Sequence, residues 1–114
     1  ANESLSNGCI LVASDTIGSS PYLINNGENG FMFHSASPSS SFDNPDHLAL
    51  EDLINKVVYL LEHREELMRM KHNARENMQK LWSPKHAAEN LMQLIDDLKN
   101  GRDTSIKVGP CSKA

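Results

Sequence analysis

The pattern of apolar and polar positions changes character near Asn44. Before this residue, short apolar runs lie between clusters of Gly, Ser, Asn and Pro, a pattern typical of strands and tight turns. After it, apolar residues recur at helical spacing over long stretches. The chain therefore predicts strands and one short helix in its first part, followed by long amphipathic helices.

Two strands and a short helix are expected before Asn44. Cys9 to Ser14 form a continuous apolar run, which favours a strand buried on both faces of a parallel sheet. Phe31 to Phe33 follow a glycine-containing turn and predict a second strand. Between them, Ser20 is suited to cap a helix whose first residue is Pro21, so we expect a short helix from Pro21 to about Asn25.

Three long helices are expected after Asn44. The pair Asn44-Pro45 predicts a capped start for the first. Leu67 to Leu81 carry the pattern of the second, and Ser83-Pro84 open a third that Gly101 ends. The apolar positions of the first helix are Leu50, Leu53, Ile54, Val57, Val58 and Leu61, and those of the third are Ala87, Ala88, Leu91, Leu94, Ile95 and Leu98.

Two segments show no periodicity. Ser35 to Asn44 are rich in serine, and a solvated surface loop is favoured over a phosphorylation site or a catalytic serine because no partner base lies nearby in the sequence. Residues 101–114 have no helical or strand pattern and are interpreted as a C-terminal tail.

These elements define the fold class as α/β, a partial Rossmann-like domain with two short parallel strands and several amphipathic helices. Two strands alone make a poor sheet, because both of its edges stay unpaired and its faces are hard to cover. We therefore expect the chain to be part of a larger α/β domain.

The distribution of charge excludes one class of partner. The formal net charge is −4, and nucleic-acid binding needs a basic surface. No Lys or Arg occurs in residues 1–44, which carry only Glu3, Asp15, Glu28 and Asp43. We expect no nucleic acid as a partner. Residues 1–44 also supply no cation that could bind a phosphate, and a solvated acidic face is the alternative reading of this bias.

Cysteine and histidine give no sign of a disulfide framework or a metal site. Cys9 and Cys111 are too few for a small disulfide-stabilised domain, so we interpret both as free thiols in a reducing cytoplasm. No CxxC or HExxH spacing occurs, so neither a metal nor a cofactor is expected. The longest apolar run, Cys9 to Ala13, is too short to cross a bilayer.

Several segments in one order and spacing resemble a known family, the retaining glycosyltransferases of family four. The likeness extends from Glu3 to about Lys99. The first segment combines a glutamate, a small-residue helix, a glycine and a buried strand, and the second is an Asn-Gly-x-Asn-Gly turn with its following strand. The segments are Glu3–Asp15, Asn26–Phe33, Asn44-Pro45-Asp46, Asn73-Ala74-Arg75 and the closing helix Asn90–Asn100.

The resemblance implies a GT-B enzyme with two Rossmann-like domains, of which residues 1–100 would be the C-terminal half of the nucleotide-sugar-binding domain. Such an enzyme transfers a sugar, with retention, from a UDP- or GDP-sugar to a glycan or lipid-linked acceptor. It is cytoplasmic or peripheral to the inner membrane. The N-terminal domain and the family's phosphate-binding Arg and Lys would have to come from elsewhere in the parent, so the fragment should be inactive alone, with no catalytic residue of its own.

The resemblance also assigns candidate site residues. Glu3 matches the family's second motif glutamate, which accepts hydrogen bonds from the donor's ribose hydroxyls. A carboxylate suits this role because it offers two acceptor oxygens to a vicinal diol. Ser4 and Gly18 are candidates for the donor loop. The sequence departs from the family pattern at Tyr22, where the family has glutamate.

Two other readings remain open. One is a sugar-nucleotide epimerase of the same architecture, and the other is a non-catalytic helical interaction module whose strands support the helices. Whichever reading holds, the glycosyltransferase fragment included, the unpaired strand edges and the helix faces predict self-association of the chain.

Overall fold

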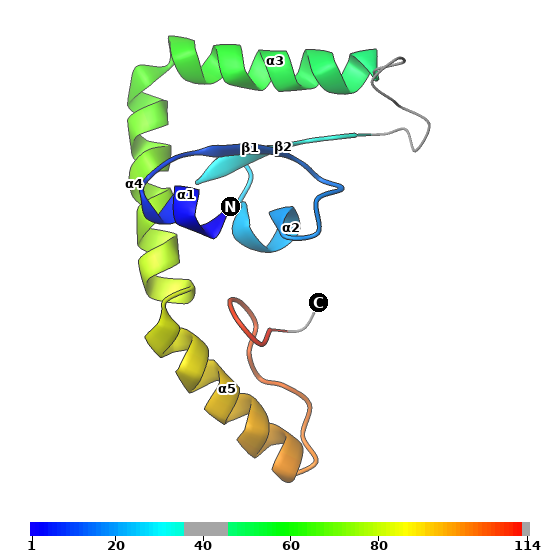
Figure 1. Ribbon diagram of the computed structural model, residues 1–114, viewed down its shortest axis with the longest axis vertical. Coiled ribbons are helices and arrows are strands. Elements are labelled where there is room, and N and C mark those ends of the chain that lie inside the picture. The colour runs from blue at the N-terminus through cyan, green and yellow to red at the C-terminus, as the bar shows by residue number, and fades with distance from the viewer. Residues whose placement is uncertain (36–45, 113–114) are drawn as a thin grey trace. The chain divides into compact units, whose positions relative to one another are not determined.

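The computed structural model describes residues 1–35 and 46–112 and shows a mixed α/β fold (Figure 1). The described residues contain two short parallel strands and five helices. In chain order they are α1 (Asn2–Ser6), β1 (Leu11–Ser14), α2 (Ser20–Leu23), β2 (Gly30–Phe33), α3 (His47–Glu62), α4 (Arg64–Leu81) and α5 (Pro84–Lys99). The chain divides into two compact units, Ala1–Arg75 and Glu76–Ala114.

The two strands pair in parallel, as predicted. Leu11 lies opposite Gly30 and Ser14 opposite Phe33. A side chain at position 30 would not fit, because a Cβ there would lie 2.6 Å from the Leu11 carbonyl oxygen. Both strands are half-buried, apart from the buried Gly30, so the expectation of a strand buried on both faces was wrong. The physical reason is that a two-stranded sheet lacks the neighbouring strands that would enclose it.

Helices lie on both sides of the strand pair within the first unit (Figure 1). α3 packs against both strands, while α1 and α2 lie on the opposite side. Phe31 of β2 meets Tyr59 of α3 edge to face, with ring centroids 6.0 Å apart. The buried apolar side chains of this unit are Leu5, Leu23, Ile24, Ala49, Leu60, Met70 and Ala74.

The helix ends follow local capping rules, with two corrections. Ser83 caps α5 by accepting a hydrogen bond from His86 N–H, as predicted. The cap of α3 is Asp46, whose carboxylate accepts hydrogen bonds from the first-turn N–H groups, whereas Asn44-Pro45 lie outside the described residues. Ser20 is the first residue of α2 rather than its cap. The serine-rich segment beyond Ser35 also falls outside the described residues.

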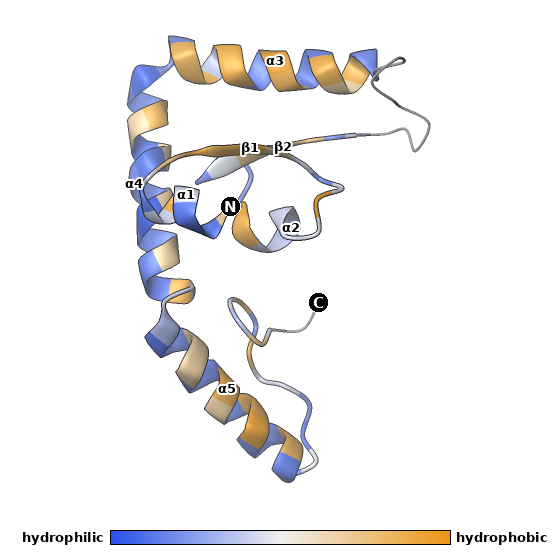
Figure 2. Ribbon diagram, viewed as in Figure 1, coloured by the Kyte–Doolittle hydropathy of each residue, from blue (hydrophilic) through white to orange (hydrophobic). Residues whose placement is uncertain are grey.

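Apolar side chains remain exposed along α3 and α5. Orange positions recur along both helices in Figure 2. Of the apolar residues on α3, only Ala49 and Leu60 are buried, whereas Ile54 is 51% exposed and Leu61 64%. On α5, Leu98 is 63% exposed. Single exposed apolar residues are ordinary, but repeated exposure along one helix leaves an apolar surface in contact with solvent.

The C-terminal segment is an ordered part of the second unit, which the sequence pattern did not predict. Gly101, with φ of +65°, ends α5 as expected, and the chain then turns back along this helix. Ser105 donates hydrogen bonds from its N–H and its hydroxyl to Asp97, at 3.0 and 2.9 Å. Further on, the Asn90 side-chain amide donates to the Pro110 carbonyl at 2.9 Å.

Candidate functional site

Glu3 lies in the first turn of the short helix α1 with its side chain exposed. Its carboxylate has no hydrogen-bond or ion-pair partner among the described residues. Only its backbone carbonyl is engaged, by the Asn7 side chain at 2.8 Å. The half-buried Ser4 helps to end the helix, because its carbonyl accepts a hydrogen bond from Cys9 N–H at 2.9 Å. The Glu3 carboxylate is therefore available to a ligand, and among the described residues it makes no hydrogen bond or ion pair that would stabilise the fold.

Gly18 lies in the exposed loop between β1 and α2. A Cβ added at Gly18 would meet no atom within 4 Å, so neither packing nor backbone conformation requires a glycine there. Tyr22 of α2 is 50% exposed. Among the described residues, no hydrogen bond or ion pair joins Gly18 to Glu3 or Ser4.

A polar cluster joins the carboxyl ends of the two strands, and sequence reasoning missed it. Asp15 follows β1 and His34 follows β2, and His34 Nδ1 lies 2.5 Å from Asp15 Oδ2. The other carboxylate oxygen of Asp15 accepts a hydrogen bond from Ser35 N–H at 3.2 Å. The signal was available in the sequence, because residues that end neighbouring parallel strands meet at one edge of the sheet, where ligands often bind.

In this cluster, the Asp15 carboxylate and the His34 ring favour each other's charged forms. The hydrogen bond from His34, reinforced by the one from Ser35 N–H, holds the pKa of Asp15 below its ordinary value. The same hydrogen bond and the negative charge of Asp15 raise the pKa of His34. On α3, Lys56 lies 2.5 Å from Asp52 and lowers the pKa of that carboxyl. In each of these two pairs, one on the strand ends and one on α3, opposite charges lie together. The described residues hold no group of three His, Cys, Asp or Glu that could bind a metal ion.

Helix α4 clamps the turn that leads into β2. Within the turn, the buried Asn29 accepts a hydrogen bond from Asn25 N–H at 2.7 Å and donates one to the Leu23 carbonyl at 3.0 Å. From α4, Arg69 donates to the Gly27 carbonyl at 3.1 Å and Asn73 donates to the Glu28 carbonyl at 3.0 Å. These bonds join segments more than 40 residues apart in the sequence.

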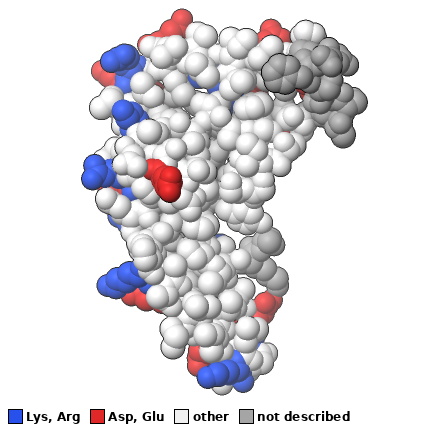
Figure 3. Space-filling view, in the orientation of Figure 1, with Lys and Arg blue, Asp and Glu red and all other residues white. Residues whose placement is uncertain are grey.

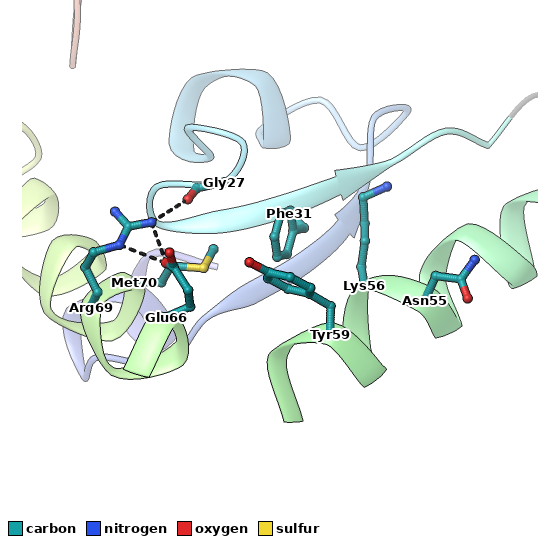
Figure 4. Close-up of a pocket in the computed structure, with 8 residues that line it drawn as sticks. All are labelled: Gly27, Phe31, Asn55, Lys56, Tyr59, Glu66, Arg69 and Met70. Carbon is teal, nitrogen blue, oxygen red and sulfur yellow. Dashed lines mark hydrogen bonds and ion pairs between the residues drawn. The ribbon is translucent and has the colours of Figure 1, made fainter. Parts of the chain in front are cut away.

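A pocket of about 390 Å³ opens beside this clamp (Figure 4). The turn, β2, α3 and α4 each contribute to its wall. Its aromatic wall is formed by Phe31 and Tyr59, and the fully buried Met70 also lines it. The remaining lining residues are Gly27, Asn55, Lys56, Glu66 and Arg69. No sequence motif marks this pocket, because its residues come from four separate segments.

Charged side chains are sparse on the face drawn in Figure 3. Lys and Arg lie mainly along the edge that α4 occupies, and the area beside that edge is white apart from one red acidic patch. This agrees with the absence of Lys and Arg from residues 1–44. In the part of the chain that the structure describes, no helix is long and apolar enough to cross a bilayer.

Comparison with known proteins gives no relative from which a role could be transferred. A scan against protein-family models, a search of curated proteins and a search of solved structures each returned no match for this chain. Any functional assignment therefore depends on the residues and their geometry.

Proposed function

We propose that this chain is the C-terminal half of the nucleotide-sugar-binding domain of a retaining GT-B glycosyltransferase. In the parent enzyme it would help to hold a UDP- or GDP-sugar, whose sugar is transferred to a glycan or lipid-linked acceptor. The chain would supply a ribose contact from Glu3. Phosphate-binding cations and the acceptor-binding domain would come from other parts of the parent.

The observation that carries the proposal is the contact between two of the motif segments. The Asn26–Gly30 turn and the Asn73-Ala74-Arg75 segment are two of the segments that resemble this family. Asn73 donates to the Glu28 carbonyl at 3.0 Å, and Ala74 is fully buried. Segments that belong to one fold are expected to contact each other in the structure, whereas segments that resemble a family by chance are not.

Glu3 is chemically suited to the ribose. Its carboxylate is exposed and has no partner in the described part of the chain, so no internal ion pair has to break before a diol binds. In open α/β sheets, ligands gather at the carboxyl ends of strands and at the helix termini beside them. Glu3 belongs to the first turn of the helix that leads into β1, which agrees with such a location. A partial Rossmann-like domain is the corresponding fold proposal.

A non-catalytic helical interaction module is the second candidate, and the exposed apolar residues of α3 and α5 favour it. The same residues are compatible with the first proposal, because a larger α/β domain would cover them. Nucleotide binding separates the two candidates, since an interaction module has no reason to recognise a ribose diol.

The test is a titration of the isotope-labelled chain with UDP, GDP and inorganic pyrophosphate, followed by NMR. We expect UDP or GDP to shift the backbone amide signals of Asn2–Ser6, while pyrophosphate leaves them unchanged because it lacks the diol. No turnover of a UDP- or GDP-sugar is expected from the chain alone. An unchanged spectrum with both nucleotides, or an equal response to pyrophosphate, would contradict the ribose-binding proposal and favour the interaction module.

A further inference from the structure

The pocket between β2, α3 and α4 has the features of a binding site for a small molecule. Its volume of about 390 Å³ falls in the range that ligand pockets occupy. Phe31 is half-buried and Tyr59 is 39% exposed, so their rings offer accessible aromatic surface. Neither Glu3 nor Gly18 lines the pocket, so a ligand bound here would not depend on the residues of the proposed nucleotide site.

The polar edge of the pocket is held in place by a network of hydrogen bonds. Arg69 Nη2 lies 2.7 Å from Glu66 Oε2 and donates to the Gly27 carbonyl at 3.1 Å, and its Nε also donates to Glu66 at 2.8 Å. Figure 4 shows the Glu66 carboxylate and the Tyr59 hydroxyl pointing toward the same space. This arrangement fixes a carboxylate acceptor beside an aromatic wall.

The charges of the pocket disfavour an anionic ligand. Arg69 is paired with Glu66, and Lys56 is paired with Asp52 at 2.5 Å. Both cations are therefore already neutralised, and a phosphate or carboxylate would have to compete with these carboxylates. A donor N–H or O–H on the ligand, in contrast, can bond to Glu66 Oε1, which has no partner among the described residues.

We propose that this pocket binds a planar, uncharged aromatic molecule of one or two rings that carries a hydrogen-bond donor at its edge. The ring packs against the aromatic wall that Phe31 and Tyr59 form, beside the Met70 side chain, since aromatic rings interact favourably with each other and with thioether sulfur. The donor points to the carboxylate of Glu66.

Indole is a suitable probe, because it is planar, uncharged and has a single N–H donor. Its N-methyl derivative keeps the shape but cannot donate, and indole-3-carboxylate adds a negative charge. An NMR titration of the full chain should show indole shifting the signals of Phe31, Tyr59 and Met70. N-methylindole should bind roughly tenfold more weakly, which is the loss expected for one hydrogen bond to a charged group. Indole-3-carboxylate should also bind more weakly, because its negative charge would lie near the carboxylate of Glu66.

Variants separate a specific site from adsorption to apolar surface. Tyr59→Ala should weaken indole binding about tenfold or more through loss of the aromatic wall. Met68→Ala is the matched control, because Met68 is an exposed apolar residue of α4 that does not line the pocket. Glu66→Gln should reduce the preference for indole over N-methylindole. Circular dichroism of each variant checks that the helices are retained.

Three outcomes would overturn this proposal. One is equal affinity for indole and N-methylindole. The second is an equal loss of binding in Met68→Ala and Tyr59→Ala. The third is a response to indole that spreads over the exposed residues of α3 and α5 instead of the pocket. A nucleotide titration that fails leaves all of these measurements unaffected, so the two proposals fail separately.

Discussion

His34 and Asp15 join the carboxyl ends of the two parallel strands, with His34 Nδ1 2.5 Å from Asp15 Oδ2. The two residues are 19 positions apart and belong to the ends of different strands. The contact is on the surface, since the His34 side chain is 74% exposed. Its contribution to stability is therefore small, but it depends on pH in a defined direction.

The first prediction concerns this pH dependence. The raised pKa of His34 gives a contribution that is fully present below the ordinary histidine value of 6.5 and is lost as pH rises through the folded pKa. The lowered pKa of Asp15 gives a contribution present above 3.8 and lost as pH falls through its folded pKa. The pair should thus stabilise the fold most between these two values.

Thermal unfolding of His34→Gln measures this effect. The wild-type chain should have a higher Tm than the variant at about pH 5.5, and the difference should shrink at about pH 9. His47→Gln, which alters an exposed histidine at the start of α3, is the control. A difference in Tm that grows toward high pH would show that the pair does not act as described.

The two strands and the three long helices could be predicted because each depends on local pattern, and the continuous apolar run before Ser14 also indicated a parallel sheet. The run before Ser14, the cap at Ser83 and the glycine at 101 are short-range signals. The packing of residues 102–112 onto α5 could not be predicted, because it depends on Asp97 and Asn90 reaching backbone groups of a segment without periodicity. The same holds for the pocket and the His34–Asp15 pair, which form only in three dimensions. Nor could spacing reveal that most apolar residues of α3 stay exposed.

A second prediction concerns the short distance between β1 and β2 at Gly30. Gly30→Ala should destabilise the chain by about 1–3 kcal/mol, because the new Cβ would lie 2.6 Å from the Leu11 carbonyl oxygen and force the strands apart. Gly18→Ala is the matched control and should change the free energy of unfolding by less than about 0.5 kcal/mol, because nothing lies within 4 Å of its Cβ. Urea unfolding of both variants makes the comparison. Equal midpoints would contradict the close approach.

A third prediction concerns the segment that follows α5. Asp97 is 3% exposed and accepts two hydrogen bonds from Ser105, which, through the N–H bond above all, lower the pKa of its carboxyl. Asp97→Ala should release this segment and raise the hydrogen-exchange rate at Ser105 by roughly tenfold or more. The neighbouring Asp96→Ala, which removes an exposed carboxylate, should have a much smaller effect. Unchanged protection of Ser105 in Asp97→Ala would show that the segment is held by other contacts.

Self-association is the fourth expected property. The exposed apolar residues of α3 give the chain a surface that a second copy can cover, so its mass in sedimentation should rise with concentration. Ile54→Glu, at a position that is 51% exposed, should reduce this association, whereas Gln79→Glu adds the same charge at an exposed polar position and should not. A monodisperse monomer at high concentration would contradict the prediction.

The last prediction tests the central claim, that Glu3 recognises the ribose of a nucleotide. The measurement is the ratio of dissociation constants for UDP and 2′-deoxy-UDP, or for the corresponding guanosine pair if GDP binds better. In the wild-type chain the 2′-deoxy nucleotide should bind about tenfold more weakly, because it can offer only one hydroxyl to the carboxylate. In Glu3→Ala the affinity for UDP should fall roughly tenfold to a hundredfold and the ratio should approach unity. The Tm should hardly change, because Glu3 has no partner in the described part of the chain. A variant that keeps both the wild-type affinity and the wild-type preference for the 2′-hydroxyl would show that Glu3 does not bind the ribose.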